Sequence, residues 1–288
     1  TAGKLTSRHL IGSYELTFDS SIEFNFKNYE VLEEDDIRGE YVIEAERAMV
    51  IENSSQLIAN INSLRDGDTV RWYLKAGNYG IITLDKNASV SIIGCYDPSV
   101  EEEKIIVQFT QIIVKHGSLN LDIIKFNRFE EKANLVIENA SAVTLSNTHF
   151  FAVNDQPGEV SPKVPKTTAI HMVQTFGNTL FINNSIFKNY EKAVLVSGGS
   201  IEVTNSTFGN NTIGCEITTR NKYVYFENVI FNGNTTALNF VTEKANTSLQ
   251  NNVFSGNGTA INRSKVVLRA DTIYQNIFTA NNKNIVPE

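Results

Sequence analysis

The chain has 288 residues, of which 41% are hydrophobic and 20% are charged, which is enough apolar content to bury one long core or two ordinary ones. Its formal net charge is −7, so it lacks the basic surface that attracts phosphate backbones and anionic lipids, and we expect no nucleic-acid partner. No apolar run approaches the roughly 20 residues that a membrane-spanning helix needs, so no membrane span is expected.

Residues 1–48 are predicted to form an N-terminal β-strand arm or small β-subdomain. Two alternating segments precede the acidic run at 33–36 and predict two strands that share one apolar face. Because a lone two-stranded ribbon is marginal in water, these strands need a partner in the same chain or in another molecule. The predicted contact residues are Tyr14, Leu16, Phe18, Ile22, Phe24 and Phe26.

Residues 49–69 predict a short capping helix followed by a turn. Ser54 or Ser55 is the expected N-cap, and a turn is expected at 66–68. Apolar residues follow the cap at helical spacing, which indicates an amphipathic helix suited to cover the end of a core. These residues are Leu57, Ile58, Ile61 and Leu64.

Residues 70–288 repeat with a period of about 23 residues, marked by a recurring Phe. Successive marker Phe residues are 24, 37, 21, 23, 23 and 24 residues apart. The long interval is an ordinary unit that carries a 13-residue insertion at about 156–168, where three prolines indicate a loop. The markers are Phe126, Phe150, Phe187, Phe208, Phe231, Phe254 and Phe278.

Within each unit, apolar and polar residues alternate, as in "SIEVTNSTF", which favours strands over helices. The units are too short for propeller blades of about 40 residues, and they lack the Leu pattern of leucine-rich repeats. The sequence therefore predicts an all-β fold, a parallel β-helix of about nine coils. Neighbouring coils would pair ~4.8 Å apart, with equivalent side chains stacked along the axis.

Asparagines flank the marker Phe on both sides. An Asn three residues before the Phe is expected at a corner, since Asn tolerates left-handed backbone and bonds neighbouring groups. We expect these side chains to stack into a ladder beside an interior Phe stack. The predicted ladder is Asn147, Asn184, Asn205, Asn228 and Asn251. A second Asn is expected to close the next corner, at Asn211, Asn234, Asn257 and Asn281.

The pattern is similar to the right-handed parallel β-helices of the pectin-lyase-like superfamily. The tetrapeptides "FGNN", "FNGN", "FSGN" and "FTAN" also resemble the Phe-x-x-Asn motif of chlamydial polymorphic membrane proteins. The resemblance implies a right-handed solenoid, in which a short helix often caps the N-terminal end.

Catalytic residues are hard to find in this pattern. Hydrolysis of a glycosidic bond usually needs two nearby carboxylates, and the Glu residues after position 155 show no shared phase that would stack them. His116, His149 and His171 are the remaining candidates. We expect no enzyme activity, cofactor or metal. Cys95 and Cys215 lie too many coils apart for a disulfide and are expected to be buried thiols.

The chain contains ten Asn-x-Ser/Thr sequons, which are glycosylation acceptors in secreted eukaryotic proteins. Asn205 is expected to stay unmodified because it belongs to the predicted ladder. The candidates for modification, in predicted turns, are Asn87, Asn234, Asn246 and Asn257.

Three functions are compatible with these patterns. The first is an extracellular or cell-surface structural protein, a glycosylated subunit that self-assembles head to tail into a filament or coat. Its partners would be copies of itself and N-linked glycans. The second is a surface adhesin that binds a glycan or a host surface, and the third is a polysaccharide lyase or hydrolase.

Overall fold

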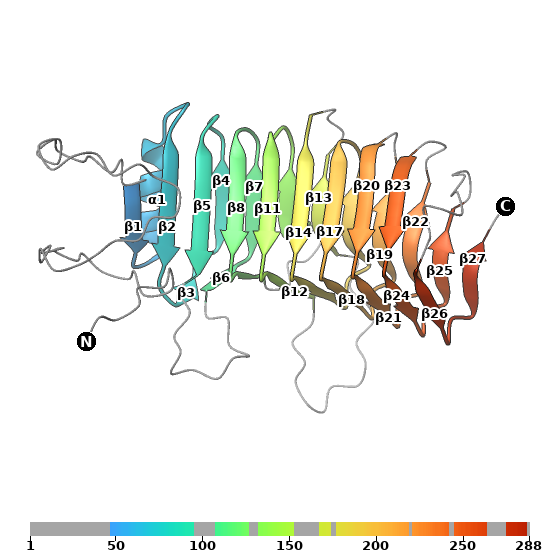
Figure 1. The fold of residues 1–288 in the computed structure, drawn as a ribbon. Coiled ribbons are helices and arrows are strands. Elements are labelled where there is room, and N and C mark those ends of the chain that lie inside the picture. Colours follow the sequence, from blue (N-terminus) through green and yellow to red (C-terminus); the bar gives the residue numbers. More distant parts are fainter. Residues whose placement is uncertain are drawn as a thin grey trace, which may run out of the picture.

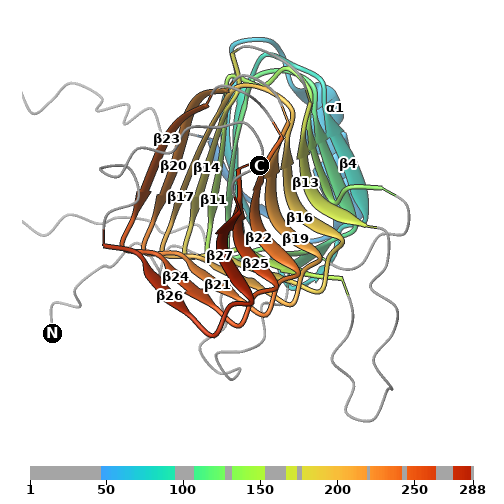
Figure 2. The same ribbon diagram turned by 90° about the vertical axis from the view of Figure 1, so that its right-hand side faces the viewer.

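The computed structural model describes residues 47–94, 107–126, 132–152, 167–173, 177–218, 221–241, 245–263 and 275–286. In this part of the chain the backbone winds into a parallel β-helix with one helix near its N-terminal end (Figure 1). The coils between the first and the last described ones each contribute a strand to each of three sheets, which enclose a common core (Figure 2). The predicted all-β solenoid is confirmed.

The three sheets each contain nine of the described strands, and neighbouring described strands pair in parallel. Sheet A consists of β1 (Arg47–Ile51), β2 (Thr69–Leu74), β5 (Ser89–Gly94), β8 (Ser118–Asp122), β11 (Ala142–Ser146), β14 (Thr179–Asn183), β17 (Ser200–Thr204), β20 (Asn221–Glu227) and β23 (Ala245–Gln250). Sheet B consists of β3 (Gly77–Asn78), β6 (Val107–Phe109), β9 (Lys125–Phe126), β12 (His149–Phe151), β15 (Ile186–Lys188), β18 (Thr207–Gly209), β21 (Ile230–Asn232), β24 (Val253–Ser255) and β26 (Ile277–Thr279). Sheet C consists of β4 (Ile81–Leu84), β7 (Gln111–Val114), β10 (Leu135–Ile137), β13 (Thr168–Met172), β16 (Lys192–Val196), β19 (Ile213–Ile217), β22 (Thr236–Phe240), β25 (Thr259–Asn262) and β27 (Lys283–Val286).

The single described helix, α1 (Ser54–Ser63), follows β1 and precedes β2 along the chain. Its N-cap is Asn53, whose side chain accepts a hydrogen bond from the backbone N–H of Gln56 at 3.0 Å. The predicted caps Ser54 and Ser55 are instead the first residues of the helix. Sheet A also starts before the helix, because β1 pairs in register with β2, whereas the coils were expected to begin near residue 70.

Alternation along each strand places apolar side chains inside and polar ones outside. In β17, for example, Ile201 and Val203 are fully buried while their neighbours are partly exposed. Leu57 of α1 is fully buried against the same core, to which Leu64 also belongs. Among the described residues, no helix has the length and hydropathy to cross a membrane.

Two predicted segments lie largely outside the described residues. The insertion expected at about 156–168 overlaps the structure only at its last two residues, and Thr168 begins β13. Since β10, β13 and β16 still pair in register, the sheet continues across this interval without a slip. The N-terminal arm, with all six of its predicted contact residues, also lies outside the described part.

Candidate functional site

The seven predicted Phe residues form one continuous stack inside sheet B. Successive ring centroids lie 4.5 to 5.0 Å apart, with interplanar angles of 3° to 17°. Six of these side chains are fully buried, and only Phe278, in the last described coil, is partly buried. The stack also continues toward the N-terminus through Phe109 and Tyr79, at centroid distances of 6.2 and 5.6 Å. Neither residue was predicted, since Phe109 falls outside the spacing of the marker Phe residues and Tyr79 is not a Phe.

A buried ladder of asparagines runs beside the Phe stack, and it is formed by the second set of Asn residues. Oδ1 of Asn234, of Asn257 and of Asn281 accepts from the backbone N–H and from Nδ2 of the Asn one coil earlier, at 2.9 to 3.0 Å. Each Nδ2 also donates to the carbonyl of the marker Phe of the preceding coil, at 2.8 to 3.2 Å. These residues are Asn211, Asn234, Asn257 and Asn281. Buried amides with every group paired in this way stabilise a unique arrangement of the coils.

A tyrosine occupies the ladder position in the preceding coil. Tyr190 is fully buried, and its backbone N–H donates to Oδ1 of Asn211 at 3.0 Å. Its hydroxyl donates to Oδ1 of Asn134 at 2.8 Å, so the aromatic ring fills the core while its polar end stays paired.

The first set of asparagines, predicted to be the stacked ladder, has a different role. All five adopt left-handed backbone, with φ between 47° and 54°, as expected of a corner. Their side chains are mostly exposed. Side-chain hydrogen bonds join only Asn184 to Asn147 and Asn147 to Asp122 in succession at this corner, among the described residues. Asn205 donates instead to Oδ1 of Asn183, at 3.0 Å. The expectation of a continuous ladder at this corner was therefore wrong, because a side chain on this outer corner points to solvent.

Burial separates the four predicted glycosylation sites into two pairs. Asn87 and Asn246 are exposed and remain candidates. Asn234 and Asn257 are each 1% exposed, and their amides belong to the buried ladder. A glycan on either amide nitrogen would break the ladder, so these two predictions are corrected. Asn205 was expected to stay unglycosylated because it would belong to the ladder. Its side chain is exposed, so this reason no longer applies.

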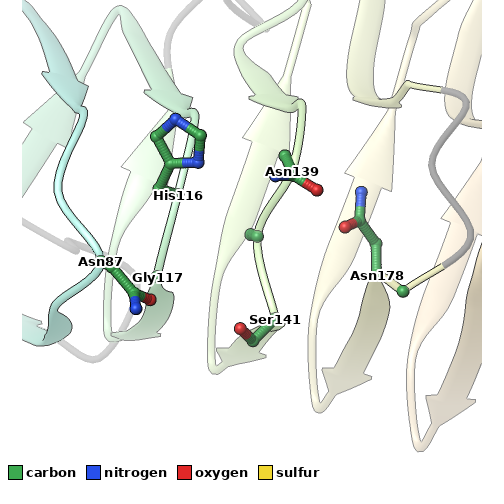
Figure 3. Close-up of a pocket in the computed structure, with 8 residues that line it drawn as sticks. Asn87, His116, Gly117, Asn139, Ser141 and Asn178 are labelled. Atoms are coloured by element: carbon green, nitrogen blue, oxygen red, sulfur yellow. The ribbon is translucent and has the colours of Figure 1, made fainter.

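A shallow groove of about 460 Å³ lies where sheet C turns into sheet A, along the turns of successive coils. Figure 3 shows side chains from neighbouring turns that face this groove. The lining residues are Asn87, His116, Gly117, Asn139, Ala140, Ser141, Gly177 and Asn178. They offer amides, a hydroxyl and an imidazole, but no carboxylate. The groove can therefore form hydrogen bonds, but it lacks the paired carboxylates that glycosidic hydrolysis uses.

The remaining histidine candidates face outward from the sheets. His149, on β12, and His171, on β13, are both partly buried. Burial, followed by nearby lysines, lowers the pKa of each imidazole, so both are neutral at pH 7. His116 lies in the groove, with Nε2 3.8 Å from Oδ1 of Asp85. The structure does not bring these three histidines together, since they lie in different turns and sheets.

One carboxylate is nearly buried on the outer face of sheet C. Glu216 is 8% exposed. One of its oxygens accepts from Nζ of Lys192 at 2.6 Å and the other from Nδ2 of Asn239 at 2.9 Å. Because both oxygens are occupied, this group stabilises the sheet rather than presenting a free base. Among the residues that the structure describes, no group of three or more His, Cys, Asp and Glu could hold a metal ion.

Two other carboxylates, which the sequence did not bring together, lie on the outer face of sheet A. Glu202 pairs in register with Tyr225, and Glu227 pairs with Thr204, so the two acids are diagonal neighbours on adjacent strands. They project from an open sheet face beside aromatic rings.

Cys215 is fully buried in sheet C, where it stacks in register between Val194 and Leu238. Burial in these apolar surroundings raises the pKa of its thiol. The predicted buried thiol is present at this position, while Cys95 lies outside the described residues.

The stacked Phe, the Asn ladder and the three parallel sheets define the class of this protein as a parallel β-solenoid. No family model matches the chain, and no curated protein matches it.

Proposed function

We propose that this chain is an extracellular structural protein, a subunit that self-assembles head to tail into a filament or surface coat. The observation that carries the proposal is the last described coil. Phe278 there continues the interior stack but remains partly exposed, whereas the equivalent Phe residues of the preceding coils are fully buried.

The same coil presents strand edges and apolar groups together. β26 and β27 are the final strands of sheets B and C within the described residues. Ile277 of β26 is 58% exposed, and Ile285 of β27 is partly buried. Unpaired N–H and C=O groups on such an edge recruit further strands. Strand addition from a second subunit would pair this edge and cover Phe278.

The proposed donor of that strand is the N-terminal arm of a neighbouring copy, through the six apolar residues predicted there. A contact between two different surfaces does not close on itself unless the rotation forms a ring, so it propagates into a filament. The likeness of the repeats to chlamydial polymorphic membrane proteins supports a surface location. Exposed Asn87 and Asn246 are the proposed glycan attachment sites.

Electron microscopy and sedimentation velocity of the purified chain test this proposal, with ordered filaments as the expected result. Deleting residues 1–28 should abolish filaments and leave the β-sheet circular dichroism of the rest unchanged. Ile277→Lys should shorten filaments, since a charge on an edge strand opposes pairing. Ile230→Lys is the matched control. Ile230 is exposed on the outer face of β21, which is not an edge strand because it pairs with β18 and β24 in sheet B. Monodisperse rods, or filaments unchanged by the deletion, would contradict head-to-tail assembly.

The groove supports a second candidate function, an adhesin that binds an uncharged glycan. Its lining of amides and one hydroxyl suits the hydroxyl groups of sugars. Binding to a panel of neutral oligosaccharides, lost in Asn139→Ala and retained in Asn228→Gly, would support this function. Release of sugars from a polysaccharide panel would instead favour the lyase or hydrolase alternative.

A further inference from the structure

One outer face of sheet A combines aromatic rings with negative charge; we call it the acidic aromatic face. It is formed by Phe181, Glu202, Tyr223, Tyr225 and Glu227. Phe181 and Tyr223 are 36% and 37% exposed. The strand register places Phe181, Glu202 and Tyr225 side by side on β14, β17 and β20.

The groups of this face are already in contact with one another. The rings of Tyr223 and Tyr225 are stacked, with centroids 5.8 Å apart. The Tyr225 hydroxyl donates to Oε2 of Glu227 at 2.8 Å. That hydrogen bond, more than any other effect, raises the pKa of Tyr225 to about 12. Within the described part of the chain, neither carboxylate of the face has a cation beside it. Aromatic faces next to uncompensated carboxylates attract cationic groups.

A basic face lies on sheet B, formed by Lys125, His149, Phe151 and Lys188. The Lys125 and Lys188 ammonium groups lie 5.7 and 5.9 Å from the centroid of the Phe151 ring. His149 packs edge-on against the same ring, with centroids 5.8 Å apart. Lys125 lies on β9 and Lys188 on β15, on either side of β12, and both ammonium groups approach the Phe151 ring. No described carboxylate forms an ion pair with either lysine. Two like charges held close together in this way would both gain from an approaching anionic surface.

We propose that the acidic aromatic face of one subunit binds the basic face of a second copy, so that the solenoids associate side by side. This inference rests on the proposed self-assembly and supplies the lateral contact of a coat. The two lysines would pair with Glu202 and Glu227, and the Phe151 ring would lie against the exposed aromatics.

The positions of the two faces along the axis define the geometry of the contact. The basic face is centred on β12 of sheet B, whose coil contributes β11 to sheet A. The acidic aromatic face is centred on β17, which is two strands beyond β11 in sheet A. Neighbouring solenoids would therefore be staggered by about two coils, or ~10 Å. Because the faces differ and lie on different sheets, a bound pair still has one free acidic aromatic face and one free basic face, on different subunits, and the contact propagates.

A charge-swap experiment tests this contact. The acid variant carries Glu202→Lys with Glu227→Lys, and the basic variant carries Lys125→Glu with Lys188→Glu. Each variant alone should lose lateral association by at least tenfold in sedimentation velocity at low salt, and filaments should be single in electron micrographs. An equimolar mixture of the two variants should restore pairing, because the two unchanged faces form the native contact and the two reversed faces are complementary to each other. Raising the salt to 0.5 M should weaken the wild-type contact, since exposed charges are screened.

Matched controls change the same net charge elsewhere. Glu52→Lys with Glu138→Lys, and Lys86→Glu with Lys132→Glu, lie off both faces and off the β26–β27 edge, and should leave lateral association within about twofold of wild type. Wild-type filaments that never pair, or variants that the mixture fails to restore, would overturn the lateral contact and leave head-to-tail assembly standing. Wild-type chains that stay monodisperse at every concentration would overturn both.

Discussion

Asparagine serves two purposes in each coil, and its burial distinguishes them. Before the Phe, Asn228 has φ of 54° and an exposed side chain, so its backbone conformation is what the corner needs. After the Phe, Asn234 is 1% exposed, and its amide binds both neighbouring coils. The first position therefore needs a residue that tolerates left-handed backbone, and the second needs an amide.

Asn234→Ala should lower the free energy of unfolding by about 3 kcal/mol. The substitution leaves the N–H and Nδ2 of Asn211 and the carbonyl of Phe208 without their partner, at a site with no room for solvent. Urea denaturation followed by circular dichroism measures the change. Asn228→Gly is the control and should shift stability by less than about 0.5 kcal/mol, since glycine adopts the same backbone freely. Equal effects at both positions would contradict the assignment of roles.

The Cys215 thiol should be inert in the folded protein. It is fully buried between aliphatic side chains, and its raised pKa keeps it protonated. In a Cys95→Ser variant, which retains this thiol alone, reaction with a disulfide reagent at pH 8 should be absent in buffer and complete in guanidinium chloride. Rapid labelling of the native variant would show that sheet C opens at this coil.

At the scale of the element, the corner turns decide how closely two coils can approach. The turn from β7 to β8 contains Gly117, whose φ is +77°. A Cβ built there would lie 2.2 Å from the carbonyl oxygen of Ala88 in the preceding coil. Glycine is needed here for both its backbone conformation and its size.

Gly117→Ala should therefore destabilise the protein by about 3 kcal/mol or more, from left-handed strain combined with the steric clash. Gly177 lines the same groove, but a Cβ there would meet no atom of the described residues within 4 Å. Gly177→Ala should change stability by less than about 0.5 kcal/mol. Melting temperatures of the two variants compare them directly, and similar values would contradict the close approach of these coils.

The helix shows how a different element can take the place of strands at the end of a solenoid. Sheets B and C begin only at β3 and β4 among the described strands, while sheet A already begins at β1. α1 follows β1 and packs against both β1 and β4, with Leu57 buried in the core. It thereby covers the apolar interior that strands of an earlier coil would cover.

At the scale of the whole molecule, stability should vary along the axis. In a solenoid each coil is stabilised mainly by its two neighbours, so a coil with one described neighbour should open first. Amide hydrogen exchange of the dispersed subunit should be at least about tenfold faster in β26 and β27 than in β18 and β19. Assembly by strand addition should slow exchange in β26 and β27 selectively. Uniform protection along the axis in the dispersed subunit would contradict this gradient.

The sequence alone determined the class of fold, the strand period and the interior Phe stack. These follow from local rules: alternation of apolar residues specifies strands, and a Phe every 23 residues or so must recur at one place in each coil. The tertiary structure decided which asparagines are buried. Asn228 and Asn234 are both polar residues near a Phe in sequence, but only the path of the backbone through its left-handed corners turns one outward and the other inward. It also decided that Glu202 and Glu227 meet on one face, and that Lys125 and Lys188 converge on one ring, because the parallel register joins residues more than 20 positions apart.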